Sequence, residues 1–262
     1  MFEPDLSQVQ TAFIASLLAG SATAIGSLAV VAVRQLPRKV EDGLLSMAAG
    51  IMLAASIFSL IVPGIEQGTQ VSGSQITGVF IVIGGILSGA MLLWLMNHYL
   101  PHEHLHMGRE GPEGIRMKRI WLFVFAITLH NLPEGTAVGV GMMQQDPAAG
   151  ESLAIGIGIQ NIPEGLAVSV ALLSVGYSRW MALLVGVISG LVEPVGGLFG
   201  GLMVWLAAPM LSYFLALAGG AMLYVISDEV IPETHRRDES GTITFSLLGG
   251  FCLMMLLDVV LG

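Results

Sequence analysis

Eight apolar runs, each about the length that crosses a bilayer as a helix, occupy most of this 262-residue sequence. Hydrophobic residues make up 54% of the chain and charged residues only 11%, more apolar surface than a soluble domain could bury. We therefore predict an all-α integral membrane protein with eight transmembrane helices, forming a single transmembrane domain over residues 1–262. The predicted spans are 10–33, 43–62, 76–99, 120–142, 151–175, 180–205, 208–230 and 243–261.

Basic residues fall on one side of the membrane if these spans alternate in direction. All ten Lys and Arg residues follow the first, third, fifth or seventh span. Lys and Arg gather in cytoplasmic loops of membrane proteins. The pattern therefore predicts both termini outside and a plasma-membrane location, with a bacterial inner membrane favoured by the compact length. The longest polar segment, 101–119, is predicted to be a flexible, histidine-containing cytoplasmic loop.

A short motif occurs twice inside this apolar sequence, as HNLPEG at 130–135 and QNIPEG at 160–165. The loop at 143–150 is short, so the two spans that carry the motif are antiparallel neighbours and the repeat is inverted. Inverted repeats build midplane sites in many transporters. Pro133 and Pro163 cannot donate to the preceding turn, so each frees a backbone oxygen. The two copies are predicted to face each other and form one site.

Ionisable residues in three of the spans fall at the same depth, near the bilayer centre. His130 and Glu134 share one helical face, as do Gln160 and Glu164, and Glu193 lies midway along the sixth span. Each such group costs roughly 3 kcal/mol in lipid and by default indicates function. Imidazole with carboxylates suits Zn²⁺, Fe²⁺ or Mn²⁺ better than Mg²⁺ or Ca²⁺. The alternative is a protonated, hydrogen-bonded cluster that holds the bundle together.

The paired motifs, the eight-span pattern and SDEVIPETH at 227–235 resemble the ZIP (Zrt-, Irt-like protein) family of divalent-metal transporters, in its bacterial branch. The resemblance covers essentially the whole chain. It implies uptake of divalent metal ions by alternating access through a two-metal site, with no enzymatic activity and no cofactor besides the transported metal. The implied ligands of the first metal are His130, Glu134, Gln160 and Glu164, and those of the second are Asn131, Asn161, Glu134, Glu164 and Glu193. Met52 matches a methionine that lines the first site in some bacterial members.

Gln160 departs from the commonest family pattern, in which histidine stands at this position. A glutamine oxygen is a harder donor than imidazole. Zinc remains the expected metal, but the departure favours a broad specificity that includes Cd²⁺, Fe²⁺, Mn²⁺ or Co²⁺.

A second group of metal-binding side chains lies at the predicted cytoplasmic face. These residues are His102, His104 and His106 in the loop, and Asp228, Glu229, Glu233 and His235 where the seventh span ends. We interpret them as an exit path, although a solvated loop and helix-capping residues would have the same composition.

Two other functions would fit the same residues. One is a metal-selective channel, because carrier and channel differ in gating and not in ligands. The other is an intramembrane metallohydrolase that activates water. The midplane residues disfavour it, because they contain no HExxH and no separate general base. The expected partners are divalent metal ions and the lipid bilayer, without nucleic acid, and a homodimer is left open.

Overall fold

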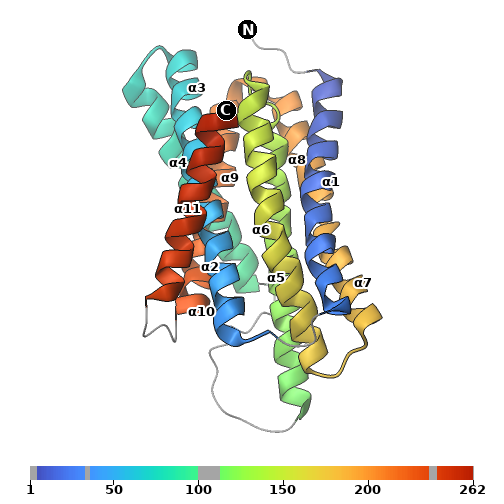
Figure 1. Cartoon of the computed structure of the whole chain (residues 1–262). Helices are drawn as coiled ribbons and strands as arrows, with labels where there is room; N and C mark the ends of the chain where they lie inside the picture. The colour runs from blue at the N-terminus through green and yellow to red at the C-terminus, as the bar shows by residue number, and fades with distance from the viewer. Residues whose placement is uncertain (1–4, 33–35, 100–112, 236–240, 262) are drawn as a thin grey trace.

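The computed structural model describes residues 5–32, 36–99, 113–235 and 241–261. Every regular element in these ranges is helical (Figure 1). The α-helices are α1 (Leu6–Leu28), α2 (Arg38–Ala54), α3 (Val62–Ser72), α4 (Gln75–Tyr99), α5 (Glu113–Gly141), α6 (Pro147–Ser174), α7 (Arg179–Gly190), α8 (Glu193–Leu206), α9 (Leu211–Val225), α10 (Ile231–His235) and α11 (Thr242–Leu261). Short 3₁₀ segments are η1 (Ala29–Val31) and η3 (Ala208–Met210), and π-helical segments are η2 (Ala55–Ile61) and η4 (Ile226–Val230).

Seven helical segments in the described part of the chain are long and apolar enough to cross a membrane. They are Leu6–Val31, Lys39–Ser72, Gln75–Met96, Pro147–Ser174, Arg179–Leu206, Ala208–Val230 and Thr242–Leu261. The predicted span 120–142 is helical as well, as part of α5, but it is not among the seven. Its apolar run is interrupted by His130, Asn131 and Glu134. The chain is thus a multi-pass, all-α membrane protein.

The helix ends separate into two faces of the bundle. The first residue of α1 and the last of α11 lie at one end, and α2, α5 and α7 begin at the other (Figure 1). Arg38 and Arg179 start α2 and α7, so these basic residues lie at the end opposite the termini. This arrangement is the one that the charge pattern predicts for alternating spans.

Two predicted boundaries differ from the structure. α5 begins at Glu113, so its first turns fall within the segment 101–119 that was predicted as a loop, while residues 100–112 lie outside the described ranges. The span predicted at 180–205 is two helices, because α7 ends at Gly190 and α8 starts at Glu193. The break places a helix start in the middle of the span.

Helix starts have a local explanation in the sequence. Asp146 accepts a hydrogen bond from the backbone N–H of Ala148 at 3.1 Å, and Pro147 occupies the first position of α6, where no N–H is needed. Ser178 likewise accepts from the N–H of Met181 at 3.2 Å at the start of α7. These caps fix where the helices on both sides of the site begin.

The helices pair along their lengths, with α1 against α6, α5 against α8, α4 against α9 and α2 against α11. Small residues occupy the pairings next to the two motifs. A side chain on Gly139 would collide with the backbone of Gly197 on α8, and one on Gly26 with the backbone of Ile162 on α6. In lipid, such close approach supplies much of the helix association energy.

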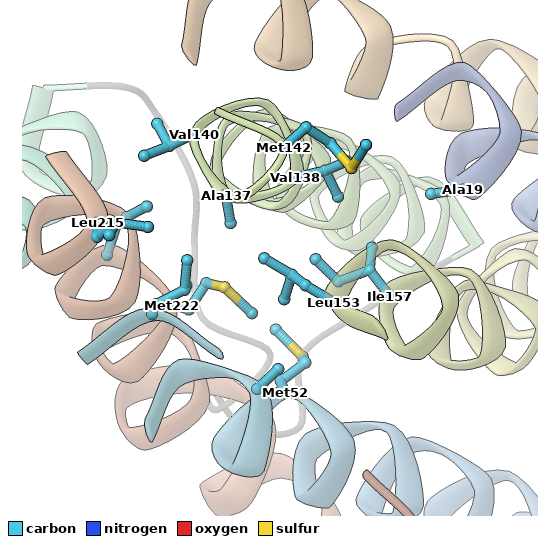
Figure 2. Packing of buried hydrophobic residues seen from close by; sticks show 14 of the residues in the cluster. Ala19, Met52, Ala137, Val138, Val140, Met142, Leu153, Ile157, Leu215 and Met222 are labelled. Atoms are coloured by element: carbon cyan, nitrogen blue, oxygen red, sulfur yellow. The ribbon is translucent and has the colours of Figure 1, made fainter. Parts of the chain in front are cut away.

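A hydrophobic cluster fills the space between α5 and α6 on one side and α2 and α9 on the other (Figure 2). Met52, Leu153 and Met222 point toward one another in it, and Ala137 lies above them. Leu153 and Ala137 are fully buried, and Met52 is 2% exposed. The cluster lies toward the end of the bundle that holds the termini, because Ala137 comes after the α5 motif and Leu153 before the α6 motif.

Candidate metal site

The two motifs lie at equivalent places on neighbouring helices, HNLPEG on α5 and QNIPEG on α6. The polar side chains of both motifs are buried inside the helix bundle. The exposed fraction is 8% or less for His130, Asn131, Glu134, Gln160, Asn161 and Glu164, and Glu193 on α8 is fully buried. The structure therefore turns all seven predicted midplane residues away from lipid.

One direct link joins the two motifs. Gln160 donates from Nε2 to Glu134 Oε1 at 2.7 Å. The prediction that the two copies face each other is supported by this bond. The amide N–H group is used, so the glutamine oxygen and the second carboxylate oxygen are left to face the interior.

Glu193 joins the site because α7 and α8 are separate helices. It is the first residue of α8, and Pro194 follows it. A carboxylate at a helix N-terminus is stabilised by the helix dipole. Its Oε1 accepts from Asn161 Nδ2 at 2.7 Å, and the same Nδ2 donates to the carbonyl of Ala19 on α1 at 2.9 Å. Asn161 thereby ties α6 to both α1 and α8.

Asn131 is held by the end of α7 instead. Its Nδ2 donates to the carbonyl of Ser189 at 2.7 Å and lies 3.2 Å from the Ser189 hydroxyl. Thr128 Oγ1 reaches the same hydroxyl at 3.0 Å. Ser189 and Thr128 were absent from the predicted site. The available signal was that Thr128 comes just before the motif and Ser189 one turn before Glu193.

Glu164 stands between the other acidic groups. It interacts electrostatically with Glu134, with Glu193 and with His130. No hydrogen bond is assigned to its side chain among the described residues. Glu164 is therefore close enough to both amide–carboxylate pairs to interact with their carboxylates.

His130 turns toward the seventh span. Its Nε2 lies 3.0 Å from Glu229 Oε2, which belongs to the π-helical segment η4. Sequence reasoning placed Glu229 on the exit path and His130 in the first metal site, and the structure joins the two. Asp228, the residue before Glu229 in η4, is exposed.

Of the remaining predicted residues, the structure describes the side chains of His235 and Met52. His235, in α10, has its Nδ1 3.1 Å from the carbonyl of Ile231. Glu233 lies in the same helix, but its side chain is outside the described set, as are His102, His104 and His106 altogether. Met52 is buried in the hydrophobic cluster of Figure 2.

Several buried oxygens at the site have no hydrogen-bond partner. They are Asn131 Oδ1, Glu134 Oε2, Gln160 Oε1, Asn161 Oδ1 and Glu193 Oε2. An unsatisfied buried acceptor costs about 1–3 kcal/mol. The three amide oxygens can only accept, and the two carboxyl oxygens can only accept while they are ionised. With ionised carboxylates, a cation is a ligand that would satisfy all five.

The acidic side chains do not converge as a simple carboxylate cage. In the part of the chain that the structure describes, no three His, Cys, Asp or Glu side chains are grouped closely enough to hold a metal ion. Amides alternate with the carboxylates instead, as Gln160 with Glu134 and Asn161 with Glu193. Any metal bound here would take amide as well as carboxylate oxygens.

The glycine that ends each motif has a role that sequence reasoning missed. A side chain on Gly135 would collide with the backbone of Glu193, and one on Gly165 with the backbone of Thr23 on α1. These glycines let α8 and α1 approach the motifs closely enough to bring Glu193 and Asn161 together. The signal available in the sequence was that a glycine follows Pro-Glu in both motifs.

Comparison with known proteins bears on this arrangement. The family model described as the ZIP zinc transporter matches residues 97–258. The chain belongs to the ZIP family. It is 43% identical over 249 residues to zinc transporter GufA of Myxococcus xanthus, which covers 95% of this chain and 98% of that protein.

Other ZIP relatives span bacteria and vertebrates. Zinc transporter ZIPB of Bordetella bronchiseptica is 45% identical over 92% of this chain and 78% of its own length. Human zinc transporter ZIP11 is 33% identical over 98% of both chains. The resemblance stated from the paired motifs is thereby confirmed.

Proposed function

We propose that this ZIP protein takes up divalent transition-metal ions, Zn²⁺ first among them, through the site formed by α5, α6 and α8. The five buried oxygens without partners carry this proposal, because a dication would be bound by several such acceptors at once. The relatives named as zinc transporters support Zn²⁺ as cargo. Liposomes containing the purified protein should accumulate Zn²⁺, and liposomes that stay at the background of empty vesicles would contradict the proposal.

The site is proposed to hold two metal ions. Two amide–carboxylate pairs support this reading, Gln160 with Glu134 and Asn161 with Glu193, since each pair presents oxygens of its own. Glu164 is proposed to bridge them, which its interactions with both other carboxylates support. Three ionised carboxylates and two dications leave a net charge of +1, whereas an empty site at −3 would be costly.

Alternating access is proposed for the transport step. The hydrophobic cluster of Figure 2 separates the motifs from the end of the bundle that holds the termini. On the other side, the contact between His130 and Glu229 leads to the exposed Asp228. We propose that metal leaves past Glu229 and then Asp228, Glu233 and His235, with the loop histidines His102, His104 and His106 beyond, and that Met52 lines the first site when the cluster opens.

The membrane arrangement is proposed as eight spans, with α5 as the span beyond the seven apolar ones and both termini outside. The common end of α1 and α11 supports this topology (Figure 1). The basic residues at the opposite end then face the cytoplasm, and the compact chain suits a bacterial inner membrane.

Selectivity is expected to depend on Gln160. Replacing it with histidine removes the hydrogen bond to Glu134 and offers a softer imidazole donor. Uptake competition should then show the preference for Zn²⁺ over Mn²⁺ rising by about tenfold, at the low end of the effect of residues around metal ligands. The measurement is inhibition of ⁶⁵Zn uptake in liposomes by increasing Mn²⁺, for wild type and Gln160→His.

Gln144→His is the matched control for this exchange. Gln144 is also buried, but it lies in the turn after α5 and donates to the carbonyl of Ser59 at 3.3 Å. It should leave the metal preference as in the wild type. An unchanged preference in Gln160→His would remove Gln160 from the proposed ligands.

A further inference from the structure

The helices around the motifs follow an internal two-fold relation that extends beyond the motifs. Adding 30 to a residue number on α5 gives its counterpart on α6, as Asn131 gives Asn161. Adding 170 to a number on α1 gives its counterpart on α7 or α8, as Gly20 gives Gly190. α1 and α6 run opposite to α5, α7 and α8 (Figure 1), so the relation is an inverted repeat.

Backbone contacts obey this relation pair by pair. A side chain on Gly20 would collide with the carbonyl of Gly190, and a side chain on Gly190 with the carbonyl of Gly20. Three further pairs of close contacts correspond in the same way, namely Gly26 on Ile162 with Gly196 on Leu132, Gly165 on Thr23 with Gly135 on Glu193, and Gly197 on Ser16 with Gly186 on Ser27. α1 is therefore the structural counterpart of the helix pair that carries Glu193.

Hydrogen bonds of the two asparagines follow the same relation. Asn161 donates to the carbonyl of Ala19 at 2.9 Å, and Asn131 donates to the carbonyl of Ser189 at 2.7 Å. Ala19 and Ser189 are counterparts under the 170-residue shift. The relation thus holds for side chains in the site as well as for the helix backbones.

Thr23 is the counterpart of Glu193 in this repeat. The backbone carbonyl of each faces the glycine of one motif. The Glu193 side chain reaches Asn161 at 2.7 Å. Asn131 is the counterpart of Asn161 in the two-fold relation, but the shorter Thr23 side chain makes no hydrogen bond to it.

Thr23 and Asn131 each carry a buried oxygen without a hydrogen-bond partner. Thr23 Oγ1 has no hydrogen-bond partner and Thr23 is 1% exposed, and Asn131 Oδ1 is unpartnered in a fully buried residue. Thr23 Oγ1 lies 3.1 Å from where a Cβ on Gly190 would stand, beside the break between α7 and α8. The side of the site without a carboxylate therefore carries a hydroxyl and an amide oxygen, both neutral.

We propose that Thr23 belongs to the metal site as the α1 counterpart of Glu193, and that its hydroxyl and the Asn131 amide oxygen bind the transported dication from that side. The proposal rests on the proposed metal site. A glutamate at both counterpart positions would give four carboxylates and cancel the charge of two dications, which would hold the metal more firmly. One neutral position keeps the bound state at +1 and eases release.

Removing the hydroxyl tests the proposal first. Thr23→Val keeps the shape of the side chain but loses the oxygen, and Thr23→Ser keeps the oxygen. Equilibrium dialysis of the purified protein in detergent should show that Thr23→Val raises the Kd for Mn²⁺ by about tenfold, as loss of a partner around a metal typically does, while Thr23→Ser stays near wild type. Mn²⁺ is the probe because it prefers hard oxygen donors.

Exchanging the counterparts tests it more sharply. Glu193→Thr should lose most Zn²⁺ binding, and adding Thr23→Glu to it should restore binding by moving the carboxylate to the equivalent place. The matched control adds Thr11→Glu to Glu193→Thr instead, because Thr11 lies on the same helix, is exposed and is three turns away. The control should not restore binding, and thermal unfolding of each purified variant shows whether it is folded.

Equal Kd values for wild type and Thr23→Val would overturn the proposal, and this comparison decides the matter if the exchanged protein does not fold. In a folded exchanged protein, Zn²⁺ binding no better than that of the Thr11→Glu control would overturn it too. Either result leaves the proposed transport site intact provided that the wild type binds Zn²⁺. Failure of the wild type itself to bind Zn²⁺ would overturn both.

Discussion

Glu134→Ala is expected to abolish Zn²⁺ uptake by liposomes that contain the purified protein. The substitution removes the carboxylate that Gln160 contacts and one of the five unpartnered oxygens. Loss of outer partners of metal ligands already costs about 10–100-fold, so loss of a proposed metal ligand itself should reduce uptake by more than about 100-fold. The measurement is the initial rate of ⁶⁵Zn accumulation at equal amounts of folded protein. Glu164→Ala should have the same effect.

Glu66→Ala serves as the control for this loss. Glu66 is an exposed carboxylate on α3, away from both motifs. Its removal should leave the rate close to that of the wild type. Normal uptake by folded Glu134→Ala or Glu164→Ala would mean that metal crosses the membrane without the pair, and the proposed site would be wrong.

Gly135→Ala is expected to destabilise the protein and stop transport, although only one methyl group is added. That methyl group would overlap the backbone of Glu193, which cannot rotate away as a side chain could. Overpacking of this kind costs about 1–3 kcal/mol or more, and any relief must move α8 and Glu193 away from α5. Thermal unfolding in detergent should therefore show a lower Tm, and the liposome assay should show little Zn²⁺ uptake.

Gly84→Ala makes the same exchange in an open position, where nothing lies within 4 Å of the added carbon. It should keep the Tm and the uptake rate of the wild type. If Gly135→Ala behaved like Gly84→Ala, the close contact between α5 and α8 would not be what holds Glu193 in the site.

Sequence reasoning worked best where depth in the membrane decides the outcome. The spacing of HNLPEG and QNIPEG predicted that Glu134 and Gln160 would meet, and they are joined by a hydrogen bond. Hydropathy also found the apolar helices, because length and composition are enough to recognise a membrane span. Both results depend on one dimension, the position along the helix.

Rotation and continuity of the helices were harder to read. The i,i+4 spacing placed His130 and Glu134 on one face, but it did not show that His130 would contact Glu229 on another span. Hydropathy also gave one span over 180–205, because Leu191 and Val192 are as apolar in a turn as in a helix. Pro194 was a usable signal, since a residue before proline is disfavoured in helical conformation.

The glycines show a further limit. The count of 34 predicts close helix packing but does not say which glycine meets which helix. Gly135 and Gly84 are indistinguishable by residue type, and only the structure separates the crowded position from the open one. The sequence also does not reveal that Thr23 and Glu193 are counterparts. Their side chains differ in chemistry, and only their backbone contacts are alike.

Anomalous X-ray scattering from crystals grown with Zn²⁺ tests the central claim most directly. We expect a zinc peak between α5 and α6, within about 2.2 Å of a carboxylate oxygen of Glu134 and of Glu164. The peak at Glu134 should vanish in crystals of Glu134→Ala. Zinc peaks only elsewhere, such as at the exposed Asp228, with none between the two motifs, would contradict the account.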